Sequence, residues 1–155
     1  TAFYPYDTQG KPLPKDAIFS IPAIKDYLLS HQDLLLKGHS EEDCPEWYLY
    51  GRTQALKDVW ADKWAINSLI INKESIKLEK VSKGAGVYSG LYILSQTDET
   101  TLRKILITDE FVRFVRTLQH YKSGGYYTFS SKELEQYINY QLSQYENQSN
   151  LFSAE

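Results

Sequence analysis

The chain has 155 residues, 42% of them hydrophobic and 24% charged, an ordinary balance for a globular domain with one core. No apolar run approaches the ~18 residues of a membrane span, and the N-terminus lacks the composition of a secretory signal. The single cysteine, Cys44, excludes an internal disulfide, so the composition predicts a cytoplasmic protein without a membrane partner.

The charge is unevenly distributed along the sequence, although its net value is only −3. Residues 1–62 hold six basic and ten acidic side chains (−4), residues 63–132 hold eleven and six (+5), and residues 133–155 hold none and four (−4). The basic centre favours a phosphate-bearing partner, but such fluctuation also occurs without function. The chain begins at Thr1 and contains no methionine, which indicates a processed product or, as we favour, a fragment of a longer protein.

The first forty residues predict a short strand and one long helix. Residues 2–6 have the pattern of an edge strand, and residues 7–10 that of a turn. The helix is expected to begin at the N-cap Ser20, with Pro22 in its first turn, and to end at Gly38. Its core-facing stripe is expected to contain Ile24, Tyr27, Leu28, His31, Leu34 and Leu35.

The middle of the chain predicts strands. A solvated acidic loop at residues 40–46 precedes a short strand at 47–50, and longer strands are expected at 64–71, 76–81 and 87–94.

Two details of these strands concern exposed surface. Strict alternation places Lys77 and Glu79 on one wet face, with Lys83 beyond a break in the pattern. Gly90 marks a bulge or a close approach of two backbones.

The last part of the chain predicts helices separated by a short strand. Two helices are expected; Thr108 caps the second, and Gly124-Gly125 is expected to end it. After a strand at residues 126–129, the capping box at 130–133 opens a last helix, which is expected to fray beyond Ser143. The pattern predicts an α+β fold, with a small mixed, mostly antiparallel sheet and three to four helices in a single recognition domain.

Catalytic and metal-binding residues are not grouped in this sequence. His31, His39, Cys44 and His120 lack paired zinc spacings, so no metal site is predicted. A nucleophilic pair of Cys44 and His39 is disfavoured, because the neighbouring carboxylates suppress a thiolate. The segment Gly84-x-Gly86 predicts a turn rather than a nucleotide loop, because a strand follows it.

Two aromatic, glycine-containing segments have side chains suited to nucleic acid. In the first, Arg52 has the geometry to form paired hydrogen bonds with phosphate or guanine, and Gln54 with adenine, while Lys57 lies one turn further on. A surface ion pair of Arg52 with Asp58 or Asp62 is the alternative.

The second segment exposes backbone amides at residues 122–125. Tyr126 and Tyr127 point to opposite sides of a strand, so we expect one in the core and the other free to stack or to donate its hydroxyl. A hairpin of tyrosines without such a role is the alternative.

A resemblance to the C-terminal, TaqI-like specificity domain of N6-adenine DNA methyltransferases lies in three segments. They are Trp47-Tyr48-Leu49-Tyr50-Gly51-Arg52-Thr53-Gln54-Ala55-Leu56, Gly86-Val87-Tyr88-Ser89-Gly90 and Ser123-Gly124-Gly125-Tyr126-Tyr127-Thr128-Phe129-Ser130. The opening Tyr4-Pro5-Tyr6, the Gly10-Lys11 turn and the helix at 27–31 are similar to the lead-in from the catalytic domain, so the similarity covers roughly residues 3 to 142.

The resemblance implies that this chain recognises double-stranded DNA for a bacterial restriction-modification system. An N-terminal domain of the same polypeptide would bind S-adenosylmethionine and methylate adenine. The cofactor motif and the Asn-Pro-Pro-Tyr motif of that domain are absent here, so the chain alone is expected to bind no cofactor and to transfer no methyl group.

The implied organisation is a lead-in at residues 1–20, a recognition domain at 21–143 and a flexible tail at 144–155. The alternative interpretation is a protein-interaction module, or an unrelated small enzyme, whose aromatic residues form its core. Residue chemistry and resemblance together predict DNA contacts by Arg52, Thr53, Gln54, Lys57, Lys83, Tyr88, Ser89, Lys122, Ser123, Gly124, Gly125, Tyr126 and Tyr127.

Overall fold

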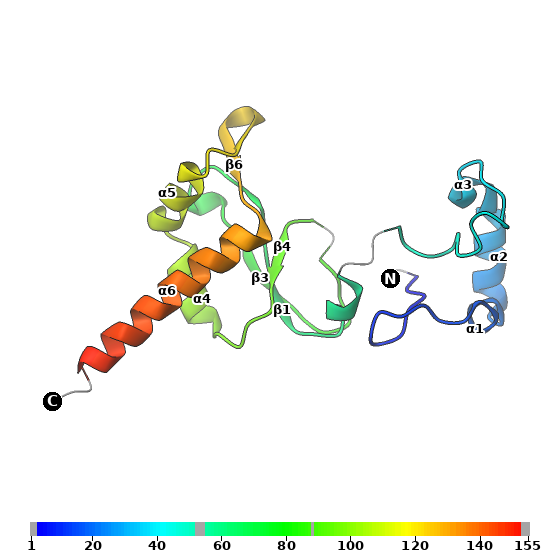
Figure 1. Cartoon of the computed structure of the whole chain (residues 1–155), viewed down its shortest axis with the longest axis horizontal. Helices are drawn as coiled ribbons and strands as arrows, with labels where there is room; N and C mark the ends of the chain where they lie inside the picture. Colours follow the sequence, from blue (N-terminus) through cyan, green and yellow to red (C-terminus); the bar gives the residue numbers. More distant parts are fainter. Residues whose placement is uncertain (1–2, 52–54, 88, 153–155) are drawn as a thin grey trace. The chain divides into compact units, whose positions relative to one another are not determined.

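The computed structural model describes residues 3–51, 55–87 and 89–152, with side chains up to residue 144. The chain forms two compact units, residues 1–60 and 61–155 (Figure 1). Helices and two small antiparallel sheets make up the fold, which confirms the predicted α+β class. The division after Trp60 does not coincide with the boundary near residue 20 that the resemblance implied.

The first unit consists of short helices joined by turns. The helices α1 (Lys15–Phe19), α2 (Pro22–Ser30) and α3 (Gln32–Leu36) follow one another, and the 3-10 helix η1 (Leu56–Asp58) comes near the end of the unit. The buried core of this unit consists of Ile18, Leu28, Leu36, Trp47 and Tyr48.

The single long helix expected in this unit is interrupted at His31. The backbone of His31 leaves helical geometry (φ −115°, ψ 8°) between α2 and α3. The interruption changes which leucines reach the core, because Leu28 and Leu36 are buried whereas Leu34 and Leu35 are exposed. The predicted core stripe is therefore only partly correct.

The predicted N-cap of this helix is also wrong. Ser20 instead ends α1, and its hydroxyl donates a hydrogen bond of 2.7 Å to the carbonyl of Ala17. Ile21 stands before α2, and Pro22 occupies the first turn as expected, since a missing N–H costs nothing there.

The two strands expected in the first unit do not form in its described residues. Residues 3–6 contribute only a single bridge, between Tyr6 and Pro12. Residues 47–50 lie in a turn, in which the N–H of Trp47 donates to the carbonyl of Cys44 at 3.1 Å. The apolar residues of this segment are buried on successive positions, which a strand with one wet face cannot achieve.

The second unit contains both sheets. In the first sheet, β1 (Lys63–Ile66) lies between β3 (Leu78–Val81) and β4 (Leu91–Ile93). In the second, β6 (Tyr126–Thr128) lies between β2 (Leu69–Ile70) and β5 (Tyr121–Lys122), and every strand pair is antiparallel. The strand expected at residues 64–71 is thus divided between the two sheets.

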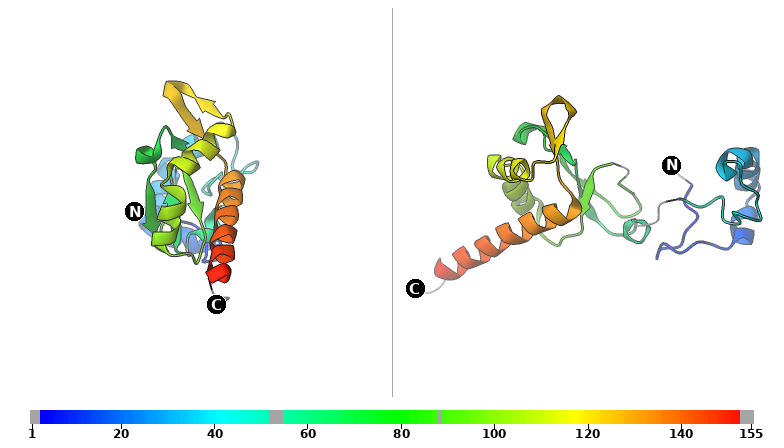
Figure 2. Two further views of the ribbon diagram at one scale, coloured as in Figure 1. Left: turned by 90° about the vertical axis from the view of Figure 1, so that its left-hand side faces the viewer. Right: turned by 45° about the horizontal axis from the view of Figure 1, so that its top comes forward.

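Three helices pack beside these strands (Figure 2): α4 (Glu99–Leu106), α5 (Asp109–Thr117) and α6 (Ser131–Phe152). Two 3-10 helices, η2 (Lys73–Ser75) and η3 (Ser123–Gly125), join strands. The core between helices and sheets buries Trp64, Ile66, Ile70, Ile76, Leu78, Leu102, Ile105, Leu106, Phe111, Val112, Val115, Phe129, Leu134, Tyr137 and Ile138.

The helix starts in this unit were predicted correctly. The hydroxyl of Thr108 accepts the N–H of Phe111 at 3.0 Å. The hydroxyl of Ser130 accepts the N–H of Glu133 at 3.3 Å, and the carboxylate of Glu133 accepts the N–H of Ser130 at 2.7 Å, which completes the capping box.

The helix ends were predicted less well. Helix α5 ends at Thr117 rather than at Gly124-Gly125, because those glycines turn the chain from β5 into β6 with φ angles of 77° and 79°. Helix α6 continues past Ser143 to Phe152.

Candidate functional site

The hairpin formed by β5, η3 and β6 contains most of the predicted DNA contacts that the structure describes. Its register pairs Tyr121 with Tyr127 and Lys122 with Tyr126. Neighbouring residues of a strand point to opposite sides. The rings of Tyr121 and Tyr127 therefore lie on one side of the hairpin, and Lys122 and Tyr126 lie on the other.

The first side of the hairpin is anchored to the unit's core. The half-buried ring of Tyr127 packs against that core, and the ring of Tyr121 lies 5.2 Å from it. The guanidinium of Arg116 lies 5.4 Å from the centre of the Tyr127 ring and donates to the carbonyl of Ile71 at 3.1 Å. Tyr127 is therefore the core-facing member of the predicted tyrosine pair.

The second side of the hairpin faces solvent. Tyr126 is 40% exposed, and the residues from Lys122 to Gly125 are all exposed. The side chain of Lys122 has no partner among the described residues, so its ammonium group is available to an anion. This side combines a cation, an aromatic ring and backbone amides, as the sequence predicted.

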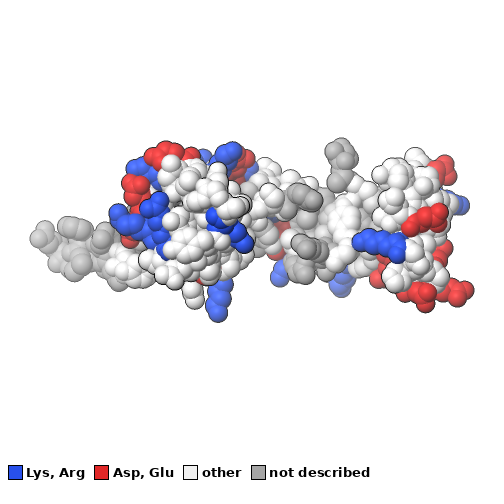
Figure 3. Space-filling view, turned by 90° about the horizontal axis from the view of Figure 1, so that it is seen from above, with Lys and Arg blue, Asp and Glu red and all other residues white. Residues whose placement is uncertain are grey.

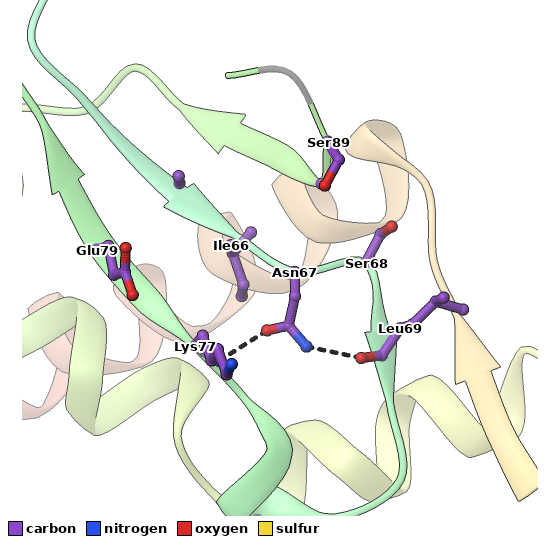
Figure 4. Close-up of a pocket in the computed structure, with 9 residues that line it drawn as sticks. Ile66, Asn67, Ser68, Leu69, Lys77, Glu79 and Ser89 are labelled. Atoms are coloured by element: carbon purple, nitrogen blue, oxygen red, sulfur yellow. Dashed lines mark hydrogen bonds between the residues drawn. The ribbon is translucent and has the colours of Figure 1, made fainter. Parts of the chain in front are cut away.

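A surface hollow of about 360 Å³ lies in the same unit (Figure 4). It lies at the connection between β1 and β2, beside the start of β3 and the residues before β4. The lining residues are Ala65, Ile66, Asn67, Ser68, Leu69, Lys77, Glu79, Ser89 and Gly90.

Asn67 shapes this hollow. Its amide nitrogen donates to the carbonyls of Leu69 and Ser75 at 2.6 and 3.0 Å, and its amide oxygen accepts the N–H of Lys77 at 2.7 Å. These bonds hold the bend between β1 and β2, and both amide hydrogens are used. Asn67 is thus a structural residue, and the neighbouring side chains are the ones free to meet a ligand.

Gly90 brings the opposite wall of the hollow close to β1. Its φ angle is +91°, and a Cβ atom there would lie 2.6 Å from the carbonyl oxygen of Ile66. The close approach predicted from this glycine is therefore confirmed, and it sets the position of the adjacent Ser89.

The hollow adjoins the hairpin through Leu69. Leu69 lines the hollow and is also paired with Thr128 of β6. The structure thereby brings Ser89 and the hairpin, which are more than thirty residues apart in sequence, to neighbouring parts of one surface.

Other predicted site residues are distributed differently. Lys83 is exposed at a turn of the second unit, where its N–H donates to Asp62 at 2.9 Å. Lys57 is exposed on η1 of the first unit. The predictions for Arg52, Thr53, Gln54 and Tyr88 lie outside the described residues.

The charge around the hairpin is mixed. Seen from above, charged side chains of both signs lie around a broad uncharged area of the second unit (Figure 3). Near the hairpin, the ring of His120 lies 3.6 Å from the carboxylate of Glu133. The pKa of Glu133 is held below its usual value, first by the N–H of Ser130 and then by its hydroxyl.

Sequence reasoning missed Asn67, Ser68 and Arg116 as parts of this surface. The signal for the first two was present, because two polar residues interrupt an otherwise apolar run at 64–71. Arg116 had no such signal, since its contact with Tyr127 depends on how α5 packs against β6.

Metal and membrane features were also sought in the described residues. No cluster of three or more His, Cys, Asp or Glu side chains suited to a metal ion occurs there. None of the described helices is both long and apolar enough to cross a membrane. Cys44 packs against the core of the first unit.

Comparisons with protein-family models, with curated proteins and with solved structures found no match to this chain. The similarity to TaqI-like specificity domains therefore stays a prediction from the motifs.

Proposed function

We propose that this chain is the DNA target-recognition module of an N6-adenine methyltransferase in a restriction-modification system. The observation that supports the proposal best is the solvent-facing side of the β5–β6 hairpin and its continuation into the Asn67 hollow. The hairpin presents Lys122 from β5 and Tyr126 from β6, and on its opposite side Tyr127 packs against the core. A rigid support of this kind suits a surface that must hold a duplex in one register.

The proposal divides the work of the parent enzyme between two domains. The catalytic domain would bind S-adenosylmethionine and receive the target adenine after it is rotated out of the duplex. The module described here would hold the flanking base pairs and the backbone. Lys122 and Lys83 are suited to phosphate, because a lysine is a flexible point charge, whereas Tyr126 offers a ring and a hydroxyl.

Binding by this chain alone should be weak and sensitive to salt, because only a few phosphates are within reach of its lysines. Each phosphate contact contributes about −0.9 to the slope of log affinity against log salt concentration. We expect Lys122→Ala to weaken binding to every duplex and to reduce that slope by about 0.9. Tyr126→Ala should weaken binding while sparing the fold.

Fluorescence anisotropy with labelled duplexes over a salt series measures both effects, and circular dichroism verifies folding. Lys104→Ala and Tyr140→Ala are matched controls, because both residues are exposed on helices outside the hairpin and the hollow. Binding that is independent of salt, or hairpin variants that behave like these controls, would contradict the proposal.

One observation favours a second function, binding to a protein. Tyr27, Leu34 and Leu35 are exposed on α2 and α3 of the first unit, with exposed fractions of 61%, 72% and 41%. Large apolar side chains that are exposed to solvent on neighbouring helices are typical of a protein contact. The two surfaces are distinguished by a Leu34→Ser variant. If DNA binding is lost in the hairpin variants but kept in Leu34→Ser, the DNA-binding surface is the hairpin and not the exposed face of α2 and α3.

A further inference from the structure

The Asn67 hollow contains two opposite charges that no neighbouring side chain neutralises. Lys77 and Glu79 are both exposed and both line the hollow. Neither side chain has a hydrogen-bond or ion-pair partner among the described residues. Lys77 directly precedes β3 and Glu79 lies within it, so in extended backbone their side chains point to the same side, with Cα atoms about 7 Å apart at a rise of ~3.4 Å per residue.

The surroundings of Glu79 leave its carboxylate open. The residue opposite it in β1 is Ala65, whose small side chain leaves room above the sheet. Figure 4 shows Glu79 on β3 and Ser89 on the far side of β1, with Lys77 near the bend held by Asn67. The volume of about 360 Å³ is at the small end of the range of ligand pockets.

A carboxylate on a DNA-contacting surface has a restricted set of uses. It only accepts hydrogen bonds, and phosphate oxygens repel it. In the major groove, however, cytosine presents an exocyclic amino group that a Glu accepts from, and the paired guanine presents O6 and N7 to a Lys. Glu79 and Lys77 together therefore match the two halves of one C·G base pair.

We propose that the Asn67 hollow reads the major-groove edge of a C·G base pair. Glu79 accepts a hydrogen bond from the amino group of cytosine, and Lys77 donates to guanine. The hydroxyl of Ser89, across the hollow, is placed to contact a neighbouring base edge. This inference rests on the proposed DNA-binding function and adds the residues that determine specificity.

The test is selection from a library of duplexes randomised at their central positions, carried out with the full chain. Glu79→Gln keeps the shape of the side chain but removes its charge. The wild type should select C·G at one position, and Glu79→Gln should lose that preference by about 5- to 150-fold. Its affinity for random duplexes should be unchanged or higher, since a repulsive charge is gone.

Glu135→Gln is the matched control, because Glu135 is exposed on α6 without a partner among the described residues. It should keep the preference for C·G. Lys77→Met should lose the preference at the same position, and thermal unfolding should show that all variants are folded.

The possible failures are distinguishable. If the wild type and Glu79→Gln select the same sequences, or if the wild type selects none while binding duplexes, the base-reading assignment is wrong and the proposed DNA binding stands. If the wild type binds no duplex even at low salt, the proposed function itself fails, and the assignment fails with it.

Discussion

Gly90 shows how a single residue shapes the candidate site. Its left-handed backbone lets the segment before β4 approach β1 so closely that any side chain would meet the carbonyl of Ile66. This requirement was visible in the sequence as a glycine inside a strand pattern. By contrast, Asn67 acts through Ser75 and Lys77, and nothing in the sequence indicated those partners.

Gly90→Ala should therefore destabilise the second unit by at least about 1–2 kcal/mol, the usual cost of a left-handed backbone for a residue with a Cβ atom. Urea unfolding followed by circular dichroism measures the change. Gly86→Ala is the control, since a Cβ there meets no atom within 4 Å and its φ angle is not left-handed. Equal midpoints for the two variants would show that the close approach is not rigid.

At the scale of elements, the features predicted best from the sequence are the helix starts, which depend on contacts between residues close in the chain. The caps of α5 and α6 join a side chain to a backbone group three residues away, and both were predicted. The break at His31 was not, because apolar spacing alone does not show which leucines the core accepts. Leu36 is buried in one cluster with Trp47 and Tyr48, whereas Leu34 and Leu35 are exposed.

The capping box of α6 gives a test of stability and of its pH dependence. Ser130→Ala should lower the free energy of unfolding by about 1 kcal/mol at neutral pH, the typical contribution of an N-cap. The pKa of Glu133 is lowered in the folded state by the N–H of Ser130. Its contribution is therefore present above the unfolded pKa, near 4.5, and is lost as the pH falls through the folded value.

Wild type should accordingly lose more stability than Glu133→Gln when the pH is lowered from about 5 to 3. Chemical unfolding at several pH values measures the difference, with Glu135→Gln as a control that retains the cap. Parallel pH profiles for wild type and Glu133→Gln would mean that the capping carboxylate does not affect acid stability.

At the scale of the whole molecule, the boundary between the units follows long-range contacts that the sequence did not reveal. The hydroxyl of Tyr4 donates to the carbonyl of Leu56 at 2.9 Å, and that of Tyr6 accepts the N–H of Tyr50 at 2.7 Å. These bonds make residues 3–6 part of the first unit. They join segments on both sides of the boundary near residue 20 that the resemblance implied, and that boundary stays a prediction.

The charges also differ between the units. Residues 1–60 hold six basic and nine acidic side chains, a balance of −3, whereas residues 61–155 hold eleven of each, a balance of zero. The second unit therefore repels the negatively charged backbone of DNA less than the first unit does. Within the second unit, the strand at residues 126–129 was predicted, but its partner β5 was not, because Gly124-Gly125 was expected to end a helix. The adjoining hollow was not predicted either, because it requires β1 and β2 to enter different sheets.

The central claim is that duplex DNA contacts the hairpin and the Asn67 hollow of the second unit. NMR of the isotope-labelled full chain, titrated with a duplex at low salt, tests it most directly. We predict that the backbone signals of Lys77, Ser89, Lys122 and Tyr126 shift together, that those of Lys104 stay unchanged, and that added salt reverses the shifts. Shifts confined to Tyr27, Leu34 and Leu35 on α2 and α3, or no shifts at all, would contradict the claim.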